Sequence, residues 1–248
     1  MSTKSFSSNK FGLSDLSTLK ENYINFKKEE ASPIHPQNYI LKIDDVRANM
    51  VNWLSFLCAK LNFSDQTLFR SVSLFDQYIS RITFEEVLTF TQDHLNLITI
   101  ACLSLSTKLE EINCNYISFL NDKVLNAPNC QIYTNKDLTK MELKILKTLK
   151  FKTIYSTPLD FVDIYIEIYK NLYFNFDNMQ FIDEIKRLTI NLMKNNIINV
   201  MFLTHSSSEF ASLCFIQALN QVKINYKANM KQIEKSIFKF TSKFSNIF

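Results

Sequence analysis

Charged side chains are concentrated at the end of one strongly apolar segment. The segment runs from Leu95 to Leu105 with apolar residues on every side of the expected helix, and it ends in Lys108, Glu110 and Glu111. A helix without a polar face has to lie at the centre of a domain. Its last turn would carry these three charges to the surface on a rigid support. Such a cluster is suited to contact with a partner protein.

Most familiar catalytic and cofactor-binding motifs are absent from the sequence. The single glycine, Gly12, excludes Walker, dinucleotide-binding and kinase glycine-rich loops, which need glycine where the backbone approaches phosphate. The three histidines are far apart, and the five cysteines form no C-x-x-C pair. We therefore expect no metal, no cofactor and no catalysis. Scattered free thiols are typical of a reducing compartment, which here means the nucleus and the cytoplasm.

The overall composition indicates a soluble globular protein, with 46% apolar and 21% charged residues. No apolar run reaches the length of a membrane span, and the first ten residues lack the apolar core of a signal peptide. The net charge of +4 comes mainly from lysine, because arginine occurs only at positions 47, 70, 81 and 187. Sequence-specific DNA recognition favours arginine, so nucleic acid is not the expected partner.

An arginine lies on the apolar face of the helix expected over residues 44–61. Arg47 shares that face with Val51, Leu54, Cys58 and Leu61. An unpaired charge in the core is costly, so Arg47 needs a carboxylate, and Asp76 on the next helix is the candidate. The alternative is that Arg47 extends outward to water.

Val46, Met50 and Trp53 form a second apolar line on the same helix. Spacing alone favours packing in the core, and an exposed docking groove is the alternative. Trp53 is the only tryptophan, and aromatic anchors are enriched in binding sites.

Almost every segment has helical periodicity, and none alternates as a strand would. We expect helices near residues 44–61, 64–81, 93–109, 115–125 and 134–150, and then near 158–173, 178–202, 206–221 and 228–245. Capping signals mark several starts, at Ser64, Thr134 with Asp137, Thr157 to Asp160, and Ser206 with Glu209. The prediction is an all-α protein with an N-terminal tail (1–35) and two domains (36–156 and 157–248), each around a central buried helix.

Several motifs, in the same order along the chain, resemble the cyclin family. Residues 46–54, Val-Arg-Ala-Asn-Met-Val-Asn-Trp-Leu, resemble the segment Met-Arg-Ala-Ile-Leu-Val-Asp-Trp-Leu of cell-cycle cyclins. Residues 71–79, Ser-Val-Ser-Leu-Phe-Asp-Gln-Tyr-Ile, resemble the cyclin helix that supplies a buried aspartate. Residues 106–111, Ser-Thr-Lys-Leu-Glu-Glu, are similar to the family signature Ser-Lys-Phe-Glu-Glu.

The resemblance continues into the second half. Residues 133–134 and 141–146 resemble the fifth helix of the cyclin box, and residues 157–161 resemble the opening of a second box. The match is good over residues 36–156 and weaker over 157–248, where Ser207-Ser208-Glu209-Phe210-Ala211 is its best point. It implies two tandem cyclin boxes and a regulatory subunit that binds and activates a cyclin-dependent Ser/Thr kinase in cell-cycle progression.

The resemblance also implies roles for single residues. Lys108 and Glu142 match the pair that hydrogen-bonds kinase backbone beside the kinase αC helix, and Arg47 and Asp76 match an internal ion pair. The other positions that we assign to the kinase interface are Glu110, Glu111, Leu105, Leu146 and Phe151. Val46, Met50 and Trp53 would form a partly exposed groove for substrate docking peptides.

The chain departs from the family pattern in the proposed docking helix. Asn49 replaces an isoleucine, and Phe56 stands where cyclins that bind arginine-containing motifs usually carry a glutamate. A less acidic groove would recognise a chiefly apolar motif, and the alternative is that it recognises no motif. Lys20-Glu21-Asn22 spells a KEN degradation motif in the expected tail, which three residues can also produce by chance.

Two other functions remain open from the sequence. The first is a nucleic-acid-binding transcription factor with the cyclin fold, although such proteins usually carry a zinc ribbon and clustered arginines. The second is a helical scaffold that binds partners without activating a kinase. Lysines at positions 223, 227, 231, 235, 239 and 243 form a basic stripe, which we interpret as the solvated face of an amphipathic helix.

Overall fold

The computed structural model describes residues 16–34, 44–83, 86, 89–112, 133–173 and 179–225. The helices of the first part are α1 (Leu16–Lys28), α2 (Asp44–Leu61), α3 (Asp65–Ile79), α5 (Gln92–Glu110) and α7 (Asn135–Thr148). Those of the second part are α8 (Pro158–Tyr173), α9 (Met179–Asn196), the short 3₁₀ helix η3 (Val200–Thr204) and α10 (Ser207–Asn225). The described residues contain no strand, so the all-α prediction is confirmed for them.

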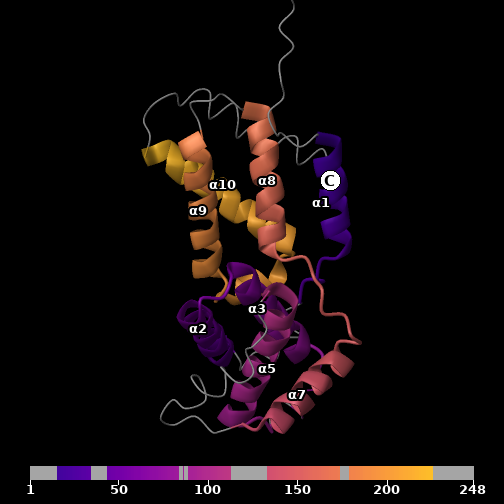
Figure 1. Ribbon diagram of the computed structural model, residues 1–248. Helices are drawn as coiled ribbons and strands as arrows, with labels where there is room; N and C mark the ends of the chain where they lie inside the picture. Colours follow the sequence, from indigo (N-terminus) through magenta and orange to yellow (C-terminus); the bar gives the residue numbers. More distant parts are fainter. Residues whose placement is uncertain are drawn as a thin grey trace, which may run out of the picture.

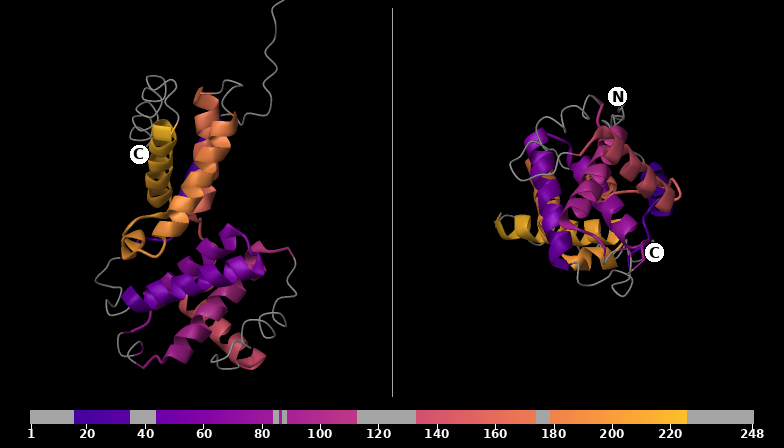
Figure 2. Two further views of the ribbon diagram at one scale, coloured as in Figure 1. Left: turned by 90° about the vertical axis from the view of Figure 1, so that its left-hand side faces the viewer. Right: turned by 90° about the horizontal axis from the view of Figure 1, so that it is seen from below.

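The helices form two stacked groups (Figure 1). One contains α2, α3, α5 and α7, and the other contains α8, α9 and α10 with α1 along its side. The side view in Figure 2 shows the same division into two groups. In the first group α5 packs against α2, α3 and α7 and is buried from Ile98 to Thr107. This confirms that the apolar segment at residues 95–105 is a central helix.

The expected capping residues begin four of the helices. At α7, Thr134 and Asp137 form a capping box in which each side chain accepts a hydrogen bond from the other's backbone N–H. At α10, the backbone N–H of Ser206 donates to the carboxylate of Glu209 at 2.9 Å. Ser64 accepts from the N–H of Thr67 at α3, and Asp160 accepts from the N–H of Thr157 at α8. These local contacts explain why those helix starts could be predicted closely.

The two helix groups share one hydrophobic core. Val51, Leu54 and Leu57 of α2 are buried in the same cluster as Phe161 of α8 and Phe215 of α10. A second cluster lies within the first group, around Ile98 and Ile100 of α5. Thus α2 and α3 form the layer of the first group that faces the second group.

The N-terminal region differs from the sequence prediction. We expected residues 1–35 to form a tail, but residues 16–28 form α1, which packs against α8. Leu19 and Tyr23 are buried, and the Tyr23 ring meets that of Phe161 edge to face at 5.6 Å. An isolated backbone bridge between Glu30 and Ser156 also ties the end of this region to the segment before α8.

Two smaller differences concern the second group. The helix expected over residues 178–202 ends at Asn196, and η3 follows it. Ala211, Cys214, Phe215 and Ala218 bury one side of α10, but the Leu213 side chain is 53% exposed, so the described helices do not surround α10 completely. The helices expected at 115–125 and 228–245, and most of the C-terminal lysine stripe, lie outside the described residues.

The described residues contain neither a candidate membrane-spanning helix nor a candidate metal-binding cluster. None of these helices is long and apolar enough to cross a membrane. The same residues contain no group of three or more histidine, cysteine, aspartate or glutamate side chains placed to hold a metal ion.

Candidate functional site

The charged end of α5 meets the middle of α7 at an ion pair. Lys108 lies in the last turn of α5, and its Nζ is 2.6 Å from Oε1 of Glu142. Ser104, one turn earlier on the same face of α5, donates from Oγ to that oxygen, also at 2.6 Å. The exposed fraction is 39% for the Lys108 side chain but only 11% for that of Glu142. Glu142 is therefore fixed against α5, while Lys108 reaches solvent.

This ion pair retains unused hydrogen-bonding capacity. An ammonium group has three N–H donors, and a carboxylate has two oxygens that can each accept. Among the described residues, the only partner of Lys108 Nζ is Glu142, and both bonds to Glu142 end at Oε1. Oε2 is left as an acceptor for another molecule. A polypeptide backbone that presents a C=O and an N–H could bind both groups at once.

Exposed apolar side chains lie on the same two helices and in the segments that follow them. They are Leu109 on α5, Ile112 just after it, Leu143 on α7, and Phe151 and Ile154 in the segment after α7. These are five of the eight large apolar side chains that are exposed in the described part of the chain. Apolar surface concentrated in this way marks an interaction site more often than scattered exposed residues do.

The three apolar positions assigned to the kinase interface differ in exposure. Phe151 is 65% exposed, Leu146 is partly buried, and Leu105 is 8% exposed within the core cluster. Lys150 and Phe151 have φ of 53° and 59°, and the N–H of Phe151 donates to the carbonyl of Leu146 at 2.7 Å. This left-handed ending, which usually needs glycine, holds Phe151 outward at a cost of about 1–2 kcal/mol per residue.

Glu110 and Glu111 have partners within the chain. Glu110 forms an ion pair with Arg70 of α3, and Arg70 also donates to the carbonyl of Tyr155. Glu111 accepts hydrogen bonds from Ser64 and Thr67 at the start of α3. Partial burial would raise the pKa of Glu111, but these hydrogen bonds outweigh it and lower the pKa. Both glutamates thus hold α3 against the end of α5 before any partner arrives.

The ion pair expected between Arg47 and Asp76 is present and completely enclosed. Arg47 is 0% exposed, and its Nε and Nη2 donate to the two Asp76 oxygens at 2.9 and 2.8 Å. Its Nη1 donates to the carbonyls of Ile197 and Ile198, just past the end of α9. Arg47 therefore joins α2 and α3 to the second helix group, and the alternative in which it extends to water is excluded.

Comparison with known proteins identifies the family. The sequence model of the family described as "Cyclin, N-terminal domain" matches residues 21–154. The chain belongs to the cyclin family. A G2/mitotic-specific cyclin-A of Hydra viridissima is 30% identical over 152 residues, which are 58% of this chain and 32% of that protein. Cyclin-B2-2 of Oryza sativa is 28% identical over 146 residues, which are 57% of this chain and 32% of that protein.

A solved cyclin structure covers more of the chain. A viral cyclin from herpesvirus saimiri superposes with a TM-score of 0.63 over 93% of this chain and 98% of that one, at 15% identity. That likeness shows the fold, which extends through both helix groups. The chain spans about a third of the length of the first curated relatives that it matches.

The outward face of α2 in this cyclin differs from the expected docking groove. Met50 is only 4% exposed and packs in the core, so the prediction that it is partly exposed is wrong. Trp53 is partly buried and touches both core clusters, and Val46 is partly buried as well. The prominent exposed aromatic is Phe56, at 58%, with Lys60 Nζ 5.7 Å from its ring centre. Residues of α2 belong to both hydrophobic clusters, and Met50 is buried in the second of them.

The KEN residues lie in α1 of this cyclin. Lys20, Glu21 and Asn22 have exposed side chains, but their backbone is helical between the buried residues Leu19 and Tyr23. The expectation of a tail is therefore wrong at these positions, whereas the expected accessibility of the three side chains agrees with the structure. A receptor that reads the motif in an extended conformation would first have to release this part of α1.

Two contributors to the site were missed in the sequence. Ser104 supplies the second hydrogen bond to Glu142, and its spacing of four residues from Lys108 was a usable signal for a shared helix face. Arg70 pairs with Glu110 across 40 residues, and local sequence carries no signal for such a contact.

Proposed function

We propose that this cyclin binds a cyclin-dependent Ser/Thr kinase through α5 and α7 and activates it in cell-cycle progression. The Lys108–Glu142 pair carries the proposal, because Ser104 holds Glu142 in place, Lys108 reaches the surface, and the pair has a donor and an acceptor that no described residue uses. A hydrogen-bonded backbone segment of the kinase, next to its αC helix, would fill both. Phosphoryl transfer belongs to the kinase, and the cyclin contributes binding.

Activation follows from selective binding to one kinase conformation. An inactive kinase holds αC displaced, so that the lysine–glutamate pair that aligns ATP is broken. A cyclin that binds only the inward αC state shifts the population toward it. A shift from 1:99 to 99:1 requires about 5.5 kcal/mol of differential binding. An interface above roughly 1,000 Å² with a few well-placed polar anchors is large enough for that.

The outward face of α2 supports a second part of the proposal, the docking of substrates. Phe56 and the partly exposed Trp53 offer aromatic surface, and Asn49 and Lys60 at the same face carry no negative charge. A docked peptide would therefore be selected by apolar side chains rather than by a basic residue. We place this activity in the nucleus and the cytoplasm, where the buried free thiols Cys58, Cys102 and Cys214 would remain reduced.

The decisive experiment combines capture with reconstitution. Tagged cyclin is incubated with extract of its own organism, and the bound proteins are identified by mass spectrometry. The captured kinase is then purified and mixed with increasing cyclin while phosphorylation of a short peptide is measured. We expect activity to rise and saturate with cyclin concentration. Nucleic acid without a kinase would favour the transcription-factor alternative, and a kinase that binds without activation would favour the scaffold.

A further inference from the structure

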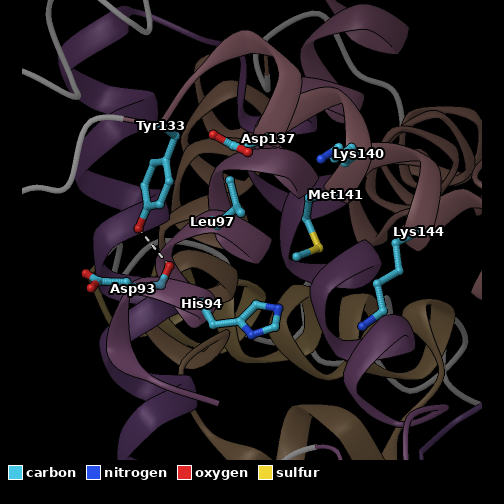
Figure 3. Close-up of a pocket in the computed structure, with 8 residues that line it drawn as sticks. All are labelled: Asp93, His94, Leu97, Tyr133, Asp137, Lys140, Met141 and Lys144. Carbon is cyan, nitrogen blue, oxygen red and sulfur yellow. Dashed lines mark hydrogen bonds between the residues drawn. The ribbon is translucent and has the colours of Figure 1, made fainter. Parts of the chain in front are cut away.

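A pocket lies away from the Lys108 end of α5, beside α7. It has a volume of about 480 Å³ (Figure 3). Leu97 and Met141 lie in its centre, with Tyr133 on one side and Lys140 and Lys144 on the other. Pockets of roughly 300–1,000 Å³ are typical of ligand sites. The space is therefore sufficient for one or two side chains of a bound peptide.

The walls of this pocket are held in place by the fold. Met141 is 6% exposed and belongs to the core cluster, and Leu97 packs against that cluster. The Tyr133 hydroxyl donates to the backbone carbonyl of Asp93 at 2.7 Å and so joins the segment before α7 to the first turn of α5 (Figure 3). The apolar floor is preformed, so a ligand would not have to order it.

Two lysines of α7, Lys140 and Lys144, line one side of the pocket. Lys136 continues this row one turn earlier on α7, and like charges spaced by four repel each other. Lys140 forms no ion pair with a described residue. Nζ of Lys144 is 2.5 Å from Oε1 of Glu86, and these side chains are 44% and 35% exposed. Ion pairs as exposed as this one contribute little to stability. An anion placed between Lys140 and Lys144 would relieve their repulsion.

The two acidic residues of the pocket offset part of the lysine charge, and Asp137 interacts electrostatically with Lys140. The carboxylate of Asp137 accepts from the backbone N–H and the hydroxyl of Thr134 in the capping box of α7. The Asp93 carboxylate points away from Leu97 and Met141 (Figure 3). A ligand that covers the apolar floor would therefore meet positive charge on the lysine side.

We propose that this pocket is a docking site for a short acidic peptide segment of a partner protein. An apolar side chain of the peptide covers Leu97 and Met141, and a neighbouring carboxylate binds between Lys140 and Lys144. On α5 the pocket residue His94 and the proposed kinase-contact residue Lys108 are about 21 Å apart along the helix axis at 1.5 Å per residue. On α7 the pocket adjoins the proposed kinase contact, because Met141 precedes Glu142.

An array of immobilised octapeptides tests the two chemical requirements. Each peptide has one central leucine or serine and zero, two or four aspartates, with serine at the other positions. Binding of the full-length cyclin should increase with the number of aspartates and fall at least tenfold when the leucine is replaced. Binding that ignores the leucine, or no binding to any peptide at millimolar ligand, would overturn the proposal.

Two variants of α7 then test the location. Lys140→Glu should weaken binding at least fivefold, while Lys147→Glu, the same charge reversal at an exposed position outside the pocket, should change it less than twofold. In ¹³C-methyl NMR spectra, the four-aspartate leucine peptide should shift the Met141 methyl and leave that of the buried Met193 in place. Equal weakening by both variants, or an unmoved Met141 signal, would show that the lysines act only as general positive charge.

Discussion

Glu142 accepts hydrogen bonds from two residues of α5, Ser104 and Lys108. The choice of substitutions in the proposed kinase-binding surface of the cyclin depends on these two bonds. The Ser104 hydroxyl is buried, so removing the carboxylate would leave a buried donor without its acceptor, at about 1–3 kcal/mol. Glutamine keeps an acceptor for Ser104 and removes the charge. Lys108 is more exposed, and its truncation leaves the bond between Ser104 and Glu142 intact.

Lys108→Ala combined with Glu142→Gln should abolish kinase activation while the thermal melt stays close to that of the wild type. Each lost interface charge can weaken the complex by about 2 kcal/mol or more, whereas exposed substitutions shift stability by about 0.5 kcal/mol. Activation is measured with a short peptide substrate over a range of cyclin concentrations. Lys147→Ala on the same helix is the matched control. Full activation by the double variant at wild-type concentration would refute the assignment.

Arg47→Ala should lower the melting temperature strongly, because it strands the buried carboxylate of Asp76. Breaking one side of a buried ion pair costs roughly 3–5 kcal/mol, and the carbonyls of Ile197 and Ile198 also lose a donor here. Differential scanning calorimetry measures the effect. Arg81→Ala, at an exposed arginine, is the control and should melt near the wild type. If the two variants melted alike, Arg47 would not have the structural role assigned to it.

At the scale of the helices, the sequence could predict those features that depend on residues close together in the chain, such as helix starts. Capping pairs three residues apart placed the starts of α3, α7, α8 and α10 within a residue of the structure. Burial of Arg47 required a carboxylate one helix away, so Asp76 could be inferred. The carbonyls of Ile197 and Ile198 lie some 150 residues further on, and no local pattern points to them.

The misses at this scale have physical reasons as well. In α1, Leu16, Leu19, Tyr23 and Phe26 have helical spacing, but the surrounding serine, asparagine and lysine made the region look like a tail. α8 supplies the apolar surface that makes this weakly apolar helix stable. Met50 was placed outward by resemblance, although its spacing favoured the core. Because α2 contributes to two clusters, its buried face is wider than the row of residues that includes Arg47 and Val51, and it also includes Met50.

Phe56→Ala on α2 should reduce phosphorylation of substrates that need docking and spare a short peptide that carries only the phosphorylation site. Phe56 is exposed and outside the core clusters, so its removal tests binding without disturbing the fold. Trp53→Ala would be ambiguous, since Trp53 packs against both clusters. The readout is the ratio of rates on the two substrates, with Asn52→Ala at a neighbouring exposed position as the control. Equal loss on both substrates would place Phe56 in kinase binding and end its docking role.

At the scale of the whole molecule, the two helix groups depend on each other. Leu54 and Leu57 of α2 are buried in the same hydrophobic cluster as residues of α8 and α10, so separating the groups would divide this cluster. Arg47 adds polar bonds across the same boundary. The residues after α1 are also tied to the segment before α8, because the N–H of Ser156 donates to the carbonyl of Glu29 at 3.1 Å. The proposed kinase-binding surface on α5 and α7 is therefore supported by a core that continues into the second group.

This shared core predicts a single cooperative unfolding transition for the chain. Trp53 is the only tryptophan and packs against both clusters, so its fluorescence reports the junction, whereas far-UV circular dichroism reports all helices. The two signals should give the same urea midpoint and the same slope, as in two-state unfolding. In Arg47→Ala both midpoints should move down together, because the lost bonds join the two groups. An early loss of tryptophan signal, with much of the helix content surviving to higher urea, would mean that the groups unfold separately and that the junction does not couple them.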